Sequence, residues 1–422
     1  MLGLTPCVSP SIIRMSSAAE ASWAAICQAL PASLAGAQTR ISAVRPTDYA
    51  RSRNHLEGAV TGLSPYITHG VVTLREVLTQ VLGREALDIQ HKLVYEFGWR
   101  EFFRHVWMRE GQGIESSLHA GALPDEAYAQ VLPSDIKEAC TGVPVIDQAV
   151  RTLYATGTLH NHARMWLASY VVHLRRVHWR AGADWMVAHL LDGDLASNHL
   201  SWQWVAGTGS HKPYLFNAEN VSRFAPADWH SPGSVIDRSY DDLERIARAE
   251  REAFAAPHTF KSGSQDRSTM LEPLVWRERP AGMNWIAPDA RSLEGQDVWL
   301  VHPWALRAPP ADMPGAVVIG VYVREYHAHW PWSQTRWRWV DAAMQDITSQ
   351  RYALDMAGLR ALLSKARCVR SVADPHISAW LTQVAQLDEA PTLFPQVDRP
   401  CTSFSQWWTR ATRGVKQAIE LL

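Results

Sequence analysis

The residues best suited to chemistry lie between positions 190 and 209, in the segment L-L-D-G-D-L-A-S-N-H-L-S-W-Q-W-V-A-G-T-G. An acidic turn opens this segment, and its last aspartate is well placed to cap the helix that we expect to follow. At helical spacing four side chains then share one face: Asp194, Asn198, Ser201 and Trp202. A carboxylate, an amide and an indole on one surface suit a buried ring that carries hydrogen-bond donors and acceptors along one edge.

A second polar face lies upstream, in H-N-H-A-R-M-W-L-A-S-Y. Asn161, Arg164 and Met165 fall on one side of a helix that we predict from His160 to Trp179. Each motif also has a purely structural interpretation, because D-G-D is common in turns and W-x-W in cores. The order and spacing of the whole set are therefore more informative than any single motif.

Two earlier segments could help to enclose a ligand. Ser64 and Pro65 form a good helix start, with a hydroxyl cap and a proline in the first turn, and such an end suits a diphosphate as well as an ordinary cap. Residues 86–110 predict a long helix with a stripe at i, i+3, i+4 and i+7 that contains Glu96, Trp99, Arg100 and Phe103. A glutamate and an arginine within an aromatic stripe favour a polar cleft over a plain packing seam.

The composition excludes several classes of protein. The 422 residues carry a net charge of −1, so any contact with nucleic acid must come from a local basic surface, and no apolar run approaches the roughly 20 residues of a membrane-spanning helix. The five scattered cysteines argue against a metal site, an iron–sulfur cluster and a disulfide framework, and they favour the cytoplasm. Twenty tryptophans are available to stack on bases or flavins, although many must belong to the core.

Patterning predicts four regions. Residues 1–19 are expected to be a loose leader and not a signal peptide, 20–230 a helical domain beginning with a helix at 20–42, and 231–290 a linker with one helix at 241–255. Residues 291–422 are expected to form an α/β domain with strands at 297–303, 316–323, 368–372 and near 392–393, and helices at 334–347 and 356–366. Strands alternating with helices predict a mostly parallel sheet.

The motifs in the first half occur in a specific order: G-V-P-V-I-D-Q-A-V-R-T-L, T-G-T-L-H-N-H-A-R-M, H-W-R-A-G, L-L-D-G-D-L-A-S-N and W-Q-W-V-A-G-T-G. Together they resemble the FAD-binding domain of the DNA photolyase/cryptochrome family. The resemblance implies an α-helical FAD-binding domain followed by a smaller α/β domain. Segments such as V-Y-V-R-E, W-S-Q-T-R-W-R-W-V-D-A-A-M and S-F-S-Q-W-W-T-R-A-T-R resemble the family's antenna domain, and the resemblance implies that this domain is shortened and permuted to the C-terminal side.

The resemblance implies FAD as the cofactor and leaves any antenna chromophore unidentified. It places Asn198 beside the flavin N5 atom, pairs Asp192 with Arg164, and lets Asp194 accept a hydrogen bond from the isoalloxazine edge. Val60 and Thr61 depart from the family's threonine–serine pair, and His162 stands where the family usually has arginine. The complete set of expected FAD contacts is Tyr49, Thr61, Gly62, Leu63, Ser64, Arg100, Asn161, Arg164, Asp192, Gly193, Asp194 and Asn198.

The function implied is light-driven repair of cyclobutane pyrimidine dimers in DNA by electron transfer from reduced FAD, as in a deoxyribodipyrimidine photolyase. The expected catalytic residues are Glu96, Trp99, Asn161, Met165, Asn198 and Trp204. Trp99 and Trp204 are expected to stack on the dimer, with Glu96 and Asn161 at the base edges. The expected DNA-binding residues are Arg53, Glu96, Trp99, Phe103 and Trp204, and we expect a monomer whose partner is damaged DNA.

The family's tryptophan relay is only partly present. Trp202 and Trp179 match its first two members, but the third position holds Glu126, with Tyr128 as the nearest aromatic residue. Two alternatives to repair remain: a cryptochrome-like blue-light sensor that binds FAD without repair, and a flavoprotein or DNA-binding scaffold without catalysis.

Overall fold

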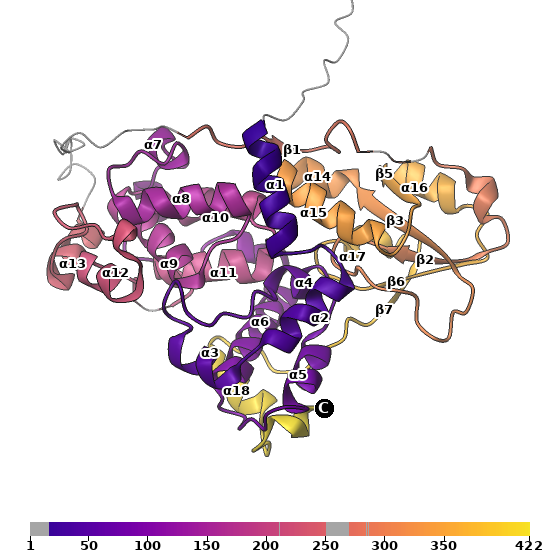
Figure 1. The fold of residues 1–422 in the computed structure, drawn as a ribbon, viewed down its shortest axis with the longest axis horizontal. Helices are drawn as coiled ribbons and strands as arrows, with labels where there is room; N and C mark the ends of the chain where they lie inside the picture. Colours follow the sequence, from indigo (N-terminus) through magenta and orange to yellow (C-terminus); the bar gives the residue numbers. More distant parts are fainter. Residues whose placement is uncertain (1–16, 211, 250–269, 284, 286) are drawn as a thin grey trace, which may run out of the picture.

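A computed structural model describes residues 17–210, 212–249, 270–283, 285 and 287–422. The predicted leader falls mainly on residues 1–16, outside this described part, whereas residues 17–19 already belong to the first helix, Ser17–Ala29. Figure 1 shows helices in the first half of the chain and an α/β unit beside them. The predicted fold class, a helical domain followed by a smaller α/β domain with a parallel sheet, is confirmed.

The helical half contains α-helices joined by short 3-10 turns and one π-helical turn. The α-helices are α1 (Ser17–Ala29), α2 (Leu34–Ala43), α3 (Pro46–Ser52), α4 (Ser64–Thr68), α5 (Leu74–Leu82), α6 (Lys92–Glu110), α7 (Ser134–Lys137), α8 (Pro144–Thr156), α9 (Asn161–Ser169), α10 (Trp179–His189), α11 (Leu195–Ala206), α12 (Ala218–Phe224) and α13 (Tyr240–Arg248). The shorter turns are η1 (Gly111–Glu115), η2 (Asp125–Ala127), the π-helical η3 (Tyr170–Leu174) and η4 (Ala227–Trp229).

Two of the predicted helices are divided in the structure. The one expected at 20–42 is broken between α1 and α2, where Pro31 cannot continue the hydrogen-bond ladder. The one expected from His160 to Trp179 ends at Leu174, and Trp179 begins α10. Between them Arg176 adopts a positive φ of 53°, and its guanidinium donates to the Ala247 and Ala249 carbonyls at 2.6 and 2.7 Å, at the end of α13. These two hydrogen bonds cap the C-terminal end of α13 and thereby favour the turn that the chain makes at Arg176.

The α/β unit is built on five parallel strands in the order β5-β3-β2-β6-β7. Its elements are β2 (Asp297–Val301), β3 (Val317–Val323), α14 (Arg324–His329), α15 (Gln334–Gln345), β5 (Arg351–Leu354), α16 (Met356–Leu363), β6 (Cys368–Val372), α17 (Ser378–Leu381) and β7 (Gln386–Asp388), with η6 (Ala290–Leu293) before them. A separate antiparallel pair joins β1 (Val275–Trp276) to β4 (Trp332–Ser333). The predicted strand near 392–393 is wrong, because the last strand is β7 at Gln386–Asp388, and β1, β4, β5 and β7 were not predicted.

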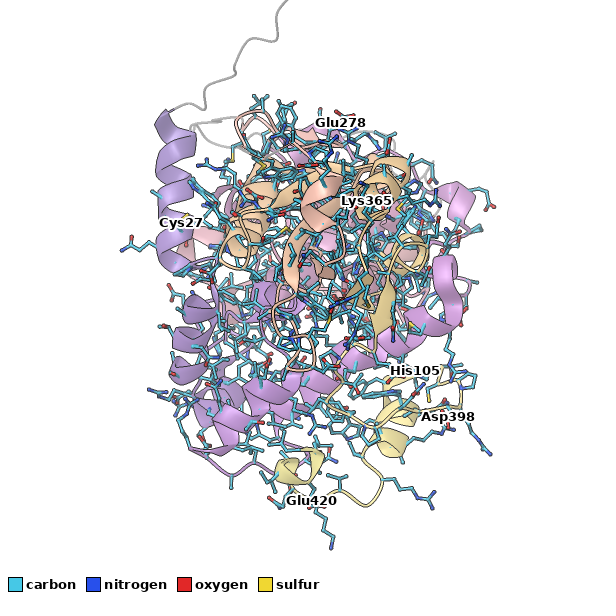
Figure 2. The ribbon with its side chains drawn as sticks, turned by 90° about the vertical axis from the view of Figure 1, so that its right-hand side faces the viewer. Cys27, His105, Glu278, Lys365, Asp398 and Glu420 are labelled. Atoms are coloured by element: carbon cyan, nitrogen blue, oxygen red, sulfur yellow. The ribbon has the colours of Figure 1, made fainter. Side chains whose placement is uncertain are left out.

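The C-terminal segment returns to the helical half. It contains α18 (Phe404–Ala411) and η7 (Ala418–Leu421), which lie against α6 and α5, and Ala418 donates to the Leu87 carbonyl at 2.9 Å. Figure 2 shows Asp398 and Glu420 of this segment below the sheet, with Asp398 on the same side as His105 of α6. The S-F-S-Q-W-W segment is thus packed on the helical half and is not part of the sheet.

Buried side chains form two hydrophobic cores that do not stop at the predicted boundary of residue 230. One core combines residues from 26–114 with residues from 293–421, and the other is built from residues 128–236. Helix α11 contributes to both, with Leu195 and Leu200 in the first and Trp202 and Val205 in the second. The candidate site lies where these two cores meet.

Candidate active site

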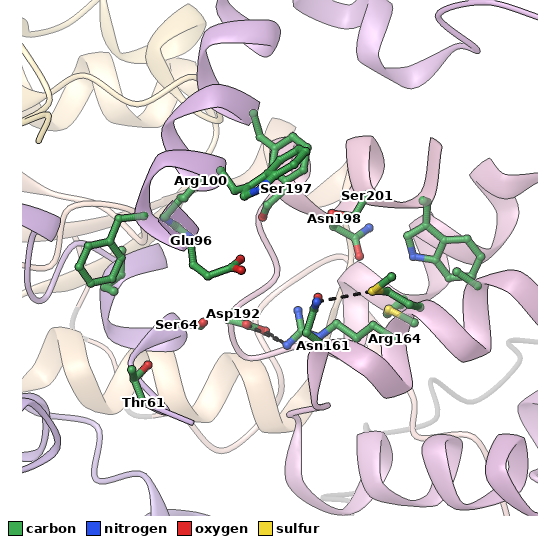
Figure 3. Close-up of a pocket in the computed structure, with 18 of the residues that line it drawn as sticks. Thr61, Ser64, Glu96, Arg100, Asn161, Arg164, Asp192, Ser197, Asn198 and Ser201 are labelled. Atoms are coloured by element: carbon green, nitrogen blue, oxygen red, sulfur yellow. Dashed lines mark hydrogen bonds and ion pairs between the residues drawn. The ribbon is translucent and has the colours of Figure 1, made fainter. Parts of the chain in front are cut away.

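A cavity of about 280 Å³ lies between the two cores (Figure 3). One wall comes from the segment that leads into α4 and from α6, and the opposite wall comes from α9, α10 and α11. Thirteen of the predicted site residues line it: Tyr49, Thr61, Ser64, Glu96, Trp99, Arg100, Phe103, Asn161, Arg164, Met165, Asp192, Asn198 and Trp202. Segments far apart in the sequence therefore converge on one cavity.

Asn198 presents the amide function of α11 to this cavity. Its Nδ2 donates to the Ala183 carbonyl of α10 at 2.9 Å, which fixes the orientation of the amide. Within the described part of the chain, no hydrogen bond is made by Oδ1. A buried amide that is held on one side and available on the other can bind a ligand N–H group.

Arg164 and Asp192 form the predicted ion pair across the cavity floor. Arg164 Nη2 lies 2.9 Å from both carboxylate oxygens of Asp192, and its Nε donates to the Leu159 carbonyl at 2.8 Å. The Asp192 side chain is 8% exposed and that of Arg164 is 26% exposed. The carboxylate of Asp192 is thus largely removed from solvent, whereas the side chain of Arg164 remains partly accessible to solvent.

Helix α6 supplies the polar and aromatic stripe of the opposite wall. Glu96 points into the cavity in Figure 3, and its Oε1 lies 3.6 Å from Arg53 Nε. Burial raises the pKa of Glu96, while the neighbouring Arg53 acts in the opposite direction. Arg53, predicted to contact DNA phosphates, instead has this carboxylate as its neighbour and does not line the cavity.

Trp99 has one face already covered. Its ring is stacked on Phe404 of α18, with centroids 4.1 Å apart and planes 9° from parallel, while Phe103 lies on another side at 5.4 Å. Because Trp99 also lines the cavity, its remaining surface is available to an entering ring. The C-terminal segment therefore holds the indole in place.

Asp194 caps α11 as predicted but does not line the cavity. It accepts from Ser197 N at 2.9 Å, is 1% exposed, and lies 3.6 Å from Arg104 and 3.8 Å from His376. Burial alone would raise the pKa of Asp194, but Arg100 and Arg104 outweigh it and hold the pKa well below the usual range. The carboxylate thus faces Arg104 of α6 and His376 of the α/β unit, and it is not positioned for the expected hydrogen bond to the isoalloxazine edge.

The relay candidates Trp202 and Trp179 are both connected to α10. Trp202 packs against Gly182 of α10, where a Cβ atom would lie 2.3 Å from the indole, and Trp179 begins the same helix. The Trp179 ring lies 5.5 Å from His178, which lies 6.3 Å from Tyr128. Glu126 is exposed, so Tyr128 is the aromatic residue at this end of the path.

Other predicted residues lie outside the cavity lining. Trp204 is 37% exposed and packs beside Tyr214 at 5.7 Å, so it does not form the second stacking wall. Ser64 is the first residue of α4, and Leu63 occupies the cap position without a side-chain hydrogen bond, contrary to the predicted hydroxyl cap. The predicted cofactor residues that do not line the cavity are Gly62, Leu63, Gly193 and Asp194.

Several lining residues were not predicted. Ser197 was not predicted, whereas Ser201, one helical turn further along α11, was predicted on the same face as Asn198 but was not included among the site residues. Apolar residues complete the walls: Ile67, Leu74, Leu93, Phe97, Ala168, Met186 and Val205. The apolar residues carry no signal that separates them from ordinary core positions.

Metal-binding clusters and membrane-spanning helices are both absent from the described residues. No group of three or more His, Cys, Asp or Glu side chains there is arranged to hold a metal ion. None of the helices in the described ranges is long and apolar enough to cross a membrane.

Comparison with known proteins places the site in a family context. Residues 93–268 match the family model described as the FAD binding domain of DNA photolyase. The chain is 32% identical over 197 residues to a deoxyribodipyrimidine photo-lyase of Synechococcus (42% of this chain, 39% of the relative). It is 34% identical over 195 residues to the Escherichia coli deoxyribodipyrimidine photo-lyase (41% of each) and 31% identical over 212 residues to the chloroplastic/mitochondrial cryptochrome DASH of Ostreococcus tauri (49% and 38%).

The similarity is limited to part of each protein, because the chain spans about two fifths of the length of these relatives. A solved structure of an archaeal photolyase from Sulfolobus tokodaii has a TM-score of 0.40 at 25% identity and covers 51% of this chain and 50% of its own. Over residues 93–268 the chain is thus similar to the FAD-binding domain of the photolyase/cryptochrome family.

Proposed function

We propose that the protein binds FAD in this cavity and uses it to split cyclobutane pyrimidine dimers in DNA under blue light. One observation supports the proposal above others. The same cavity is lined by the polar groups of Asn198, Arg164 and Asp192 and by the Glu96 and Trp99 pair of α6. A redox cofactor and a flipped base would therefore share one enclosed space.

The residues of the cavity fit the chemistry of a flavin. An isoalloxazine ring needs apolar surface on its faces and hydrogen-bond partners along its edge. The available Oδ1 of Asn198 and the Arg164–Asp192 pair provide hydrogen-bond partners for the edge of the ring. Met165, Met186 and Trp202 provide apolar surface for its faces. Tyr49, Thr61 and Ser64 supply hydroxyl groups on the α4 side, where the diphosphate would lie.

The residues on the α6 side would bind the damaged dinucleotide. A base must leave the duplex to reach the cavity, and aromatic stacking offsets the cost of unstacking it. Trp99 offers its uncovered surface for that contact, while Glu96 and Asn161 offer hydrogen-bonding groups to the base edges. Bound reduced FAD would supply the electron for light-driven opening of the cyclobutane ring.

The test is light-dependent repair by the purified protein. We expect the absorption spectrum to show bound flavin, and we expect reduced protein under blue light to remove the dimer from a defined oligonucleotide, with no loss in the dark. An intact dimer after illumination of fully reduced protein, over a range of salt concentrations, would show the repair proposal to be wrong.

A blue-light sensor is the second candidate, and specific features favour it. Phe404 covers one face of Trp99, Trp204 lies outside the cavity, and Arg53 is beside Glu96. Each of the three expected DNA-binding residues Trp99, Trp204 and Arg53 is therefore less available to DNA than the sequence predicts. A sensor would bind FAD and respond to light but would show equal affinity for damaged and undamaged DNA.

A second cavity provides a candidate place for an antenna chromophore. It has a volume of about 530 Å³ and lies between α6 and the residues that follow β2, β6 and β7. Strand order reverses between β2 and β6, and ligands of open α/β sheets bind beyond the carboxyl ends of strands at such a point. Chromophore released by denaturation should then contain a second compound or more than one FAD per chain, and a single FAD would contradict the assignment.

A further inference from the structure

The acidic turn of the candidate flavin site is held from outside by a residue of the α/β unit. Arg336 of α15 is 1% exposed. Its Nη1 donates to the Val187 carbonyl of α10 at 2.8 Å, and its Nη2 donates to the Gly193 carbonyl in the turn. One guanidinium therefore connects the end of α10 to the turn that leads into α11.

The glycine of the D-G-D motif is explained by this contact. A Cβ atom at Gly193 would lie 2.4 Å from Arg336 Nη1 and 2.5 Å from the Val187 carbonyl oxygen. Any side chain there would displace the guanidinium or the backbone. The glycine thus serves the approach of Arg336 and not only the turn itself.

A second contact from the α/β unit holds the other end of the turn. His376 accepts from the Leu195 backbone N–H at 3.2 Å through Nε2, and its Nδ1 lies 2.6 Å from Asp374. The ring is stacked on Trp304, with centroids 4.5 Å apart and planes 7° from parallel. The first residue of α11 is thereby fixed to the loop that follows β6.

Arg336 also carries a buried charge behind the turn. Among the described residues no carboxylate lies within ion-pair distance of it, and it lies over the Trp332 ring at 4.1 Å. Burial lowers its pKa to about 10, so it stays protonated at neutral pH. In a low-dielectric interior such a charge favours an electron-rich ligand on the far side of the turn.

We propose that Arg336 is a positioning residue of the flavin site, through which the α/β unit fixes the Asp192–Gly193–Asp194 turn and raises the reduction potential of the flavin. The part of this proposal that concerns the flavin rests on the proposed function. The turn carries the Asp192 partner of Arg164 and begins the helix of Asn198, so a displaced turn would misplace both groups. The α/β unit is then a structural part of the flavin site.

Two substitutions separate geometry from charge. Arg336→Gln removes the charge and the fork of donors, whereas Arg336→Lys keeps a charge but loses the planar fork. The matched control is Arg367→Gln, because Arg367 is 68% exposed and pairs with Asp297 in the same unit. We expect the FAD dissociation constant to rise at least about tenfold in both Arg336 variants, as for loss of a hydrogen bond to a charged group, and to stay unchanged in the control.

The reduction potential of bound flavin provides the readout that a purely structural role would not move. It should become more negative in Arg336→Gln and remain near the wild-type value in Arg336→Lys. Unchanged FAD affinity and potential in Arg336→Gln would overturn the proposal, and so would an equal shift of potential in both variants.

Hydrogen exchange of the apoprotein tests, without any cofactor, whether Arg336 holds the Asp192–Gly193–Asp194 turn in place. Amides of residues 187–197 should exchange faster in both Arg336 variants and in Gly193→Ala, with the rest of the chain protected as in the wild type. A wild-type protein that binds no FAD would refute the proposed function. The exchange result would still show whether Arg336 fixes the turn. Unchanged exchange at the turn in folded Arg336→Lys and Gly193→Ala proteins would overturn the role of Arg336 in fixing the turn. If one of these two variants unfolds globally, the other provides the test.

Discussion

At the scale of single residues, Asp192 is the carboxylate whose removal should be most informative. Asp192→Ala leaves Arg164 without its carboxylate partner, and the arginine remains only about a quarter exposed. We expect a loss of about 1–3 kcal/mol in unfolding free energy, as for an unsatisfied charged group, together with weaker FAD retention. Urea unfolding of the apoprotein and flavin occupancy after gel filtration measure the two effects. Asp192→Asn should recover most of the stability, and equal occupancy in wild type and Asp192→Ala would contradict the role of the pair.

Trp99 should act in the recognition of damage and not in general DNA affinity. Loss of an aromatic surface for one base costs about 1–3 kcal/mol, so Trp99→Ala should weaken binding to dimer-containing DNA about ten- to a hundredfold. Phe404→Ala should have a smaller effect of the same kind, because it frees the indole that the phenyl ring now holds. Titration of matched oligonucleotides with and without the dimer measures both. An equal loss of affinity for both oligonucleotides would assign Trp99 to the fold and not to the lesion.

Residue-level prediction succeeded where polar residues follow helical spacing. Asn161, Arg164 and Met165 reach the cavity together because α9 begins where the sequence indicated. It failed for Asp194, whose carboxylate is drawn to Arg104 and His376, since the partner from the α/β unit lies 182 positions away. No local pattern contains such a contact, and Arg336 and Phe404 escaped prediction for the same reason.

At the scale of elements, α10, α11 and the loop around η2 carry the residues that we expect to transfer electrons. If Trp202 and Trp179 pass an electron to oxidised flavin, Trp202→Phe should abolish photoreduction with an external thiol donor, while repair by chemically reduced protein continues. Tyr128 ends the aromatic path through His178, so Tyr128→Phe should slow photoreduction without changing flavin binding. Transient absorption after a light pulse provides the rates, and equal rates in wild type and Tyr128→Phe would remove this residue from the path.

The π-helical turn η3 contains a buried histidine that should make stability depend on pH. His173 contacts the Val205 carbonyl at 2.9 Å through Nε2 and is otherwise buried, and burial lowers its pKa to about 4, with Arg176 and Arg248 acting in the same direction. An unfolded histidine titrates near 6.5, so stability is fully present above about pH 6.5 and falls as the pH drops toward 4, by about 1.4 kcal/mol per pH unit. His173→Gln should flatten this part of the profile of unfolding free energy against pH. An unchanged slope would show that His173 does not titrate as its burial implies.

The elements that could be predicted were those with a strong periodic pattern. Strands β2 and β3 contain apolar runs, β6 was predicted from C-V-R-S-V, and α15 and α16 precede β5 and β6 with a helical period, so the parallel sheet was predicted correctly. Strand β5 carries Arg351, whose buried side chain pairs with Asp341 at 2.8 Å and donates to the Thr348 carbonyl at 3.2 Å, and this polar residue concealed the strand. Strand β7 has just three residues, and a strand of that length has no recognisable period.

At the scale of the molecule, the two halves of the chain share one hydrophobic core and should not fold apart. Residues 26–114 and 293–421 bury their apolar side chains together, and α18 covers Trp99 of α6. A fragment of residues 1–260 expressed alone would expose the α/β side of that core, so we expect it to aggregate or to lack a cooperative unfolding transition. Co-expression with a fragment of residues 261–422 should give a soluble complex of both fragments that elutes near the intact chain. Each fragment made alone is the control, and circular dichroism follows its unfolding. A cooperatively folded 1–260 fragment that retains FAD would contradict both the shared core and the part assigned to Arg336.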